Sequence, residues 1–166
     1  TEEAAQLPGV IGLVPTSENT PGRKATRPGD VITTYSGKTV EILNTDAEGR
    51  LSLCDALSYA QKNWQPKALV DVATLTGACV VALGDHATGV FSDDAGLRQT
   101  VLDSAAATGD LFWPLPLWTE YDANITSHVA HLAHVGPPHA AALHAALALR
   151  RSGGTDVPWL HLDLAR

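Results

Sequence analysis

The chain has little cysteine, few basic residues and no long apolar run. Its two cysteines, Cys54 and Cys79, lie in apolar stretches without CxxC spacing, which indicates buried free thiols in a reducing compartment. No apolar stretch approaches the roughly 20 residues that a membrane helix needs. The first six residues, TEEAAQ, contain neither a basic start nor an apolar segment typical of a signal peptide. We therefore expect a cytoplasmic protein with no membrane partner.

The charge balance argues against a nucleic-acid partner. Lysine and arginine number 11 against 18 acidic residues, so the formal net charge is -7, and the basic residues do not cluster. Binding to a phosphate backbone needs a basic face, which this composition does not offer. With 166 residues, 45% hydrophobic and 17% charged, the chain has the composition of one globular domain with a sizeable core.

Strand-like and helix-like segments alternate along the chain, which predicts an α/β fold with a mixed central sheet flanked by helices. Residues 68–74 form a continuous apolar run with a single acid, Asp71, a pattern typical of a central strand buried on both faces. Residues 31–35 and 38–43 flank Ser36 and Gly37, which predicts a hairpin with a two-residue turn. Further strands are expected at 9–14 and 159–164, and helices from residue 51 to about 63 and at 94–107, 126–134 and 140–151.

The loop between the hairpin and the first helix carries the chemically most informative residues. Asp46 and Glu48 are two residues apart, Arg50 follows two residues later, and Asn44 adds one more polar side chain. Carboxylates of this kind supply hard oxygen ligands to divalent ions. A guanidinium beside them binds an anion through two parallel hydrogen bonds. The loop therefore predicts part of a metal site.

The string NTDAEGRL at residues 44–51 resembles the signature of the leucine aminopeptidase family, the two-metal cytosolic peptidases of family M17. Four further strings match the same family in the same order: RPGDVITTYSGKTVEI at 27–42, VDVATLTGACVVALG at 70–84, LPLWTEYDANI at 115–125 and PWLHLDLA at 158–165. The resemblance covers residues 10–165. It implies hydrolysis of the N-terminal residue of peptides by two-metal activation of water.

The resemblance also implies the ligand set. Asp46 and Glu48 are metal ligands, and the two divalent ions are Zn, Mn or Co, since oxygen ligands discriminate poorly among them. Arg50 is the catalytic residue that holds a bicarbonate. The remaining ligands, a lysine and two aspartates, come in the family from a segment N-terminal to this one. Residues 1–166 are therefore expected to be the C-terminal portion of the catalytic domain, with the sheet incomplete at its N-terminal side.

Substrate contacts and assembly follow from the same resemblance. The expected substrate-binding residues are Asn44 and Ala47 on the leaving side, the backbone of Thr74, Leu75 and Gly77 along the peptide, and Val135 and Ala165 as pocket walls. The family forms homohexamers, so a homo-oligomer is expected, together with the segment or chain that carries the other ligands. The alternative is a catalytically inactive or processed family member that acts as a binding or assembly subunit.

The histidines offer a competing metal site. His128, His131 and His134 follow a spacing of three residues, which places them on one face of the helix expected at 126–134, and His139 and His144 follow. A zinc site made of histidines alone is conceivable. No carboxylate or cysteine accompanies them in sequence, so a solvated or interfacial histidine face is the favoured interpretation.

Overall fold

The computed structural model describes residues 9–18, 20–154 and 156–164. Its strands are β1 (Val31–Thr33), β2 (Thr39–Glu41), β3 (Leu69–Ala73), β4 (Thr88–Phe91), β5 (Phe112–Pro114), β6 (Leu132–Ala133) and β7 (Trp159–Asp163). Its helices are α1 (Gly49–Trp64), α2 (Gly77–Leu83), α3 (Ala95–Thr108) and α4 (Ala141–Ser152), with 3-10 helices η2 (Thr45–Ala47) and η3 (Thr119–Ile125). Within these residues no helix has the length and apolar character needed to cross a membrane.

The predicted α/β class is confirmed, with two mixed sheets in place of one. The larger sheet has the order β3-β7-β4-β5, in which β3 runs parallel to β7 and β4 runs antiparallel to it. The smaller sheet has the order β1-β2-β6, with an antiparallel hairpin and one parallel pair. Residues 34–38 connect the hairpin strands, so the turn is longer than the two residues predicted.

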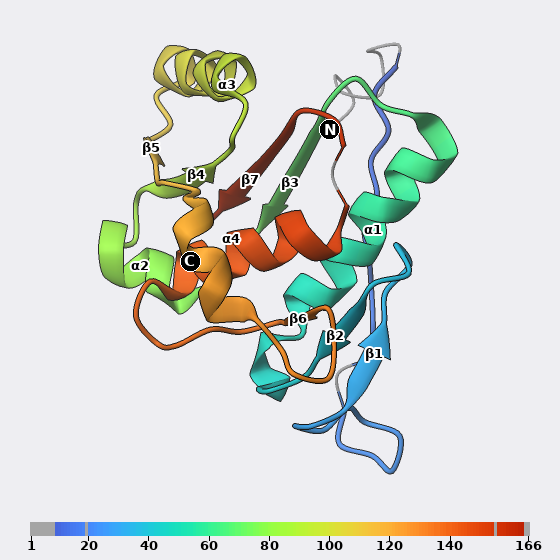
Figure 1. The fold of residues 1–166 in the computed structure, drawn as a ribbon. Helices are drawn as coiled ribbons and strands as arrows, with labels where there is room; N and C mark the ends of the chain where they lie inside the picture. Colours follow the sequence, from blue (N-terminus) through green and yellow to red (C-terminus); the bar gives the residue numbers. More distant parts are fainter. Residues whose placement is uncertain (1–8, 19, 155, 165–166) are drawn as a thin grey trace.

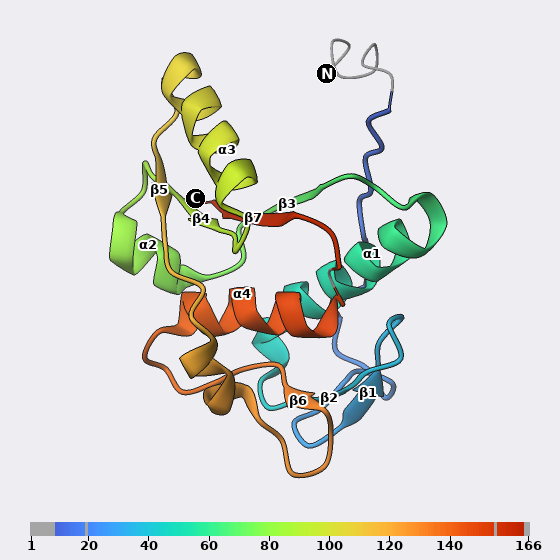
Figure 2. The same cartoon turned by 45° about the horizontal axis from the view of Figure 1, so that its top comes forward.

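The elements form layers, as Figures 1 and 2 show. The helix α3 covers one face of the larger sheet, α1 and α4 cover the other face, and the smaller sheet lies beyond them. Apolar clusters fill the spaces between the layers. One of them joins Leu57 of α1, Leu149 of α4 and Trp159 of β7. Another places Leu160 and Leu162 against α3.

The alanine-rich helix α4 is the central helix of the fold. Ala145, Ala146 and Leu149 are completely buried, because small side chains allow α4 to lie close to both sheets. Burial inside this chain accounts for the scarcity of charges on the helix, so contacts between subunits are not needed to explain it. Cys54 and Cys79 are also buried and unpaired, as predicted.

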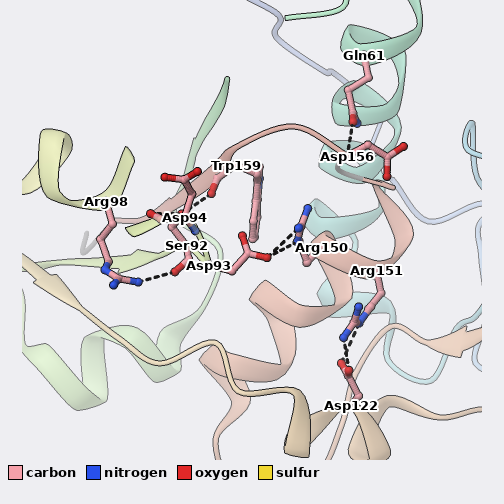
Figure 3. Close-up of polar contacts among 10 residues, drawn as sticks. All are labelled: Gln61, Ser92, Asp93, Asp94, Arg98, Asp122, Arg150, Arg151, Asp156 and Trp159. Atoms are coloured by element: carbon pink, nitrogen blue, oxygen red, sulfur yellow. Dashed lines mark hydrogen bonds and ion pairs between the residues drawn. The ribbon is translucent and has the colours of Figure 1, made fainter. Parts of the chain in front are cut away.

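Ion pairs fix the last turn of α4 (Figure 3). Arg150 binds Asp93 in the loop before α3 at 2.8 Å, and Arg151 pairs with Asp122 of η3. Both pairs are partly exposed, and such pairs stabilise a fold by at most about 1 kcal/mol. Their main effect is to fix where the end of α4 lies relative to its neighbours.

Two predicted elements are wrong, and a third is a strand as predicted but not a central one. Residues 9–14 form no strand, and Val10 and Val14 are 63% and 85% exposed. Residues 126–134 form no helix; they contain the short strand β6. The predicted central strand, β3, lies at the edge of its sheet among the described residues, and Val70 is 50% exposed. In each case an apolar or histidine spacing suggested burial or helical periodicity that long-range packing does not provide.

Candidate functional site

The acidic loop is a short 3-10 turn that leads directly into α1. The side chain of Asn44 caps this turn by accepting a hydrogen bond from the Asp46 N–H at 3.0 Å. Glu48 then occupies the position immediately before α1. Asp46 and Glu48 are both exposed. The turn therefore presents the two predicted ligands to solvent while its backbone is fixed.

Arg50 lies in the first turn of α1 and is buried, with 9% of its surface exposed. Its Nη1 donates a hydrogen bond to the backbone oxygen of His134 at 2.7 Å, whereas its buried Nε has no acceptor among the described residues. Burial lowers the pKa of Arg50 to about 10, and the charge of Asp163 opposes that decrease. The site therefore holds a buried cation with an unused donor, two residues after Glu48 and four residues after Asp46 in the sequence.

His134 holds the acidic loop in place, which the sequence did not indicate. Its Nε2 lies 2.7 Å from the backbone oxygen of Asn44 and therefore donates to it. Its Nδ1 accepts from the N–H of Leu43 at 3.3 Å. Burial, followed by the nearby charge of Arg50, lowers the pKa of His134. The Nδ1 also lies 3.1 Å from the backbone oxygen of Glu41. With 1% of its surface exposed, His134 is a buried clamp on these backbone groups and does not belong to a solvated face.

The second part of the site is the turn between β3 and α2. Thr76 caps α2 by accepting from the N–H of Cys79 at 3.1 Å. Asp163, at the end of β7, accepts hydrogen bonds from Leu75 and Thr76. A Cβ added to Gly77 would have open space among the described residues, so no contact in this part of the fold requires glycine there.

The two parts lie next to each other. A Cβ built on Gly49, between the acidic loop and Arg50, would lie 3.6 Å from the Cδ1 of Leu75. The charge of Asp163 also acts on Arg50. The fold thus joins residues 44–50 to residues 74–77, two segments that were expected to share a site.

The other predicted site residues are placed individually. Val135 directly follows the His134 clamp and is partly buried, as is Ala47, whereas Thr74 is exposed. Ala165 lies outside the described residues.

In the described part of the chain, the remaining histidines do not come together as a metal site. The Nδ1 of His131 lies 2.6 Å from the hydroxyl of Thr39, and His144 is buried between the side chain of Asn124 and the backbone of Pro137. In the part of the chain that the structure describes, no group of three or more histidine, cysteine or acidic residues could hold a metal ion. The helical spacing that suggested a zinc site is lost because residues 126–134 are not helical.

Comparison with known proteins identifies the family. Residues 3–166 match the catalytic domain of the cytosol aminopeptidase family, Peptidase_M17. The chain belongs to this family. It is 62% identical over 156 residues to a probable cytosol aminopeptidase of Nitratidesulfovibrio vulgaris, and 54% identical to that of Desulfovibrio desulfuricans. Each match covers 94% of this chain and 31% of the relative.

A solved structure agrees with this assignment to the cytosol aminopeptidase family. A mutant of tomato leucine aminopeptidase superposes with a TM-score of 0.85 and 42% sequence identity, over 89% of this chain and 29% of that one. The chain therefore spans about a third of the length of the relatives that it matches. The resemblance drawn from the motifs is confirmed.

Proposed function

We propose that this chain carries one part of the active site of a metal-dependent aminopeptidase, which hydrolyses the N-terminal residue of peptides with two divalent ions. The observation that supports this most directly is that two exposed carboxylates, Asp46 and Glu48, lie in the turn that leads into α1, whose first turn holds the buried cation Arg50. A buried guanidinium with an unused Nε–H is costly unless an anion approaches it. Relatives named cytosol aminopeptidases match across this region, and we place the protein in the cytoplasm.

The two carboxylates fit divalent ions as part of a ligand set. Among the described residues none donates a hydrogen bond to the carboxylate of Asp46, so its oxygens remain available, and carboxylate oxygens suit Zn, Mn or Co. Two ligands are too few, because each ion takes about five or six, including water. We propose that a lysine and two aspartates from polypeptide outside this segment complete the set.

The remaining residues have distinct tasks in this proposal. When bound, the ions supply Lewis acidity toward water and the peptide carbonyl, and bicarbonate supplies a proton acceptor. Arg50 holds that anion, and His134 fixes both Arg50 and the loop of Asn44. Backbone groups of the turn at residues 74–77 align the peptide main chain. Asn44 and Ala47 face the leaving residue, and Val135 and Ala165 border the side-chain pockets.

A chimera tests the proposal. The polypeptide of the Nitratidesulfovibrio vulgaris relative is produced with its matched segment replaced by the 156 residues of this chain. With Mn or Zn, the folded chimera is expected to release leucine from leucine p-nitroanilide and from short peptides. The variant Glu48→Ala is expected to lose this activity while keeping the melting temperature, because its side chain is exposed.

The matched control is Glu120→Ala, which removes an exposed carboxylate from η3 and should leave the activity unchanged. Full activity of the Glu48→Ala chimera would remove the metal assignment. A folded chimera without activity would favour the alternative of a binding or assembly subunit.

A further inference from the structure

Asp163 is a carboxylate in the middle of the fold to which the motif gave no role. It ends β7, and its exposed fraction is 0%. An ionised carboxylate in such a position is strongly destabilising unless hydrogen bonds satisfy it. The partners of Asp163 therefore indicate what this residue does.

Among the described residues, the side chain of Asp163 makes its three hydrogen bonds with the turn between β3 and α2. Its Oδ1 accepts from the backbone N–H of Leu75 at 3.0 Å and of Thr76 at 3.1 Å. Its Oδ2 accepts from the hydroxyl of Thr76 at 2.6 Å. That hydroxyl oxygen in turn accepts from the N–H of Cys79 at the start of α2. One carboxylate thus fixes both the backbone of the turn and the helix cap that follows it.

The same carboxylate acts on Arg50 without touching it. Its negative charge favours the charged form of Arg50, against the desolvation of that buried guanidinium. Asp163 therefore lies between the two parts of the candidate site, bonded to the turn at residues 74–77 and electrostatically coupled to the start of α1.

Asp71 shows what a purely structural buried aspartate looks like in the same sheet. It lies on β3, two positions before Ala73, the residue that pairs with Asp163. Its carboxylate accepts from Trp159 Nε1 at 2.7 Å and contacts His161 Nδ1 at 2.5 Å. Both partners belong to β7, so Asp71 joins neighbouring strands, and among the described residues its hydrogen bonds reach no residue of the candidate site.

We propose that Asp163 is a positioning residue of the aminopeptidase reaction, which holds the turn at residues 74–77 in the geometry that aligns the peptide main chain. This inference rests on the proposed function. With two of the N–H groups of the turn bound by Asp163, the orientation of the remaining backbone groups is set before substrate arrives. Such preorganisation affects substrate binding and alignment.

The test uses the chimera described above, in which KM and kcat are measured for a leucyl peptide. Asp163→Asn removes the charge and places an amide where the Thr76 hydroxyl needs an acceptor. We expect KM to rise by about 10- to 100-fold, the value of one or two charge-assisted hydrogen bonds. Asp71→Asn makes the same chemical change on the neighbouring strand β3, two residues before the position that pairs with Asp163. It should lower the melting temperature while KM and kcat stay at the level of the unmodified chimera.

A second pair of variants covers the case in which Asp163→Asn does not fold. Thr76→Val removes the hydroxyl that binds Asp163, and Thr76→Ser keeps it. KM of the valine variant should exceed that of the serine variant at least about threefold, because only serine preserves the hydrogen bond. In the double variant, Asp163→Asn with Thr76→Val, the increases in KM should not multiply, since both changes break the same bond.

Three results would overturn the inference. The first is a KM within twofold of the unmodified chimera for folded Asp163→Asn. The second is an equal rise in KM for Asp71→Asn, which would indicate a general loss of core order. The third is equal KM values for the two Thr76 variants. An unmodified, folded chimera without activity would instead refute the proposed function, and this inference would fall with it.

Discussion

Replacing Arg50 by methionine should raise the stability of the chain while it abolishes the proposed peptidase activity. The site holds the charged guanidinium at a cost, because burial lowers its pKa from 12.5 to about 10. Since one pKa unit corresponds to 1.36 kcal/mol, this cost is roughly 3 kcal/mol at any pH well below 10. The hydrogen bond from Arg50 to the backbone of His134 offsets roughly 2 kcal/mol of it.

The balance predicts that Arg50→Met stabilises the metal-free chain by roughly 1 kcal/mol, because methionine keeps most of the apolar stem without the charge. Arg50→Lys should do the opposite. Lysine keeps a buried charge but is too short to preserve the contact with His134, so a loss of roughly 2 kcal/mol is expected. The expected order of stability is methionine first, arginine second and lysine last.

Urea denaturation of the 166-residue chain with EDTA at neutral pH measures this order through tryptophan fluorescence, in which the buried Trp159 reports on the core. Arg27→Met, at an exposed position, is the matched control and should change the free energy of unfolding by less than about 0.5 kcal/mol. In the chimera, Arg50→Met should abolish peptidase activity. If Arg50→Lys is more stable than Arg50→Met, the claim that the charge is held at a cost is wrong.

Four further predictions concern metal, assembly, packing and pH. Isothermal titration of the 166-residue chain with Zn or Mn should show no tight site, since the chain supplies about two ligands per pair of ions; submicromolar binding would contradict the ligand set. Light scattering of the chimera at micromolar concentration should give the mass of a homohexamer, as the family resemblance implies, and a monomer would refute that. Gly136→Ala should destabilise the chain by roughly 1 to 3 kcal/mol, because the new Cβ would lie 2.7 Å from His144 Nδ1; an unchanged melting temperature would show that the contact relaxes freely. The pKa of His134 is lower in the folded chain than in the unfolded one. Below a pH of about 6.5 the unfolded chain therefore binds a proton that the folded chain does not, so the free energy of unfolding should decrease as pH falls. His134→Gln should weaken this dependence in acid denaturation curves.

The sequence predicted best what depends on local periodicity and on contiguous motifs. The helices α1, α3 and α4 were expected within one or two residues of their observed bounds, because their apolar faces repeat at helical spacing. The acidic loop was also recognisable in the sequence, since Asp46, Glu48 and Arg50 occupy every second position of one short segment, and their roles at the site stay predictions.

What the sequence could not provide are the contacts between distant segments. Asp163 touches a turn almost 90 residues earlier in the chain, and its only local signal was an acid within a strand of apolar residues. The contact of His134 with Asn44 also joins distant segments, so the sequence did not predict it. The spacing of three histidines suggested a helix instead. Burial of β3 was overestimated because its apolar run does not say how many neighbouring strands are present.

The edge of β3 has a consequence for how this segment behaves when it is produced by itself. Leu69 and Ala73 direct their backbone groups toward β7, so the alternating residues Val70 and Val72 direct theirs outward, where no described strand pairs with them. Both valine side chains are about half exposed beside that row of backbone groups. A second copy can add to such an edge by main-chain hydrogen bonds. In hydrogen exchange, the amides of Val70 and Val72 should exchange faster than the other amides of β3. A lysine in place of either valine is the change that would keep isolated copies from pairing.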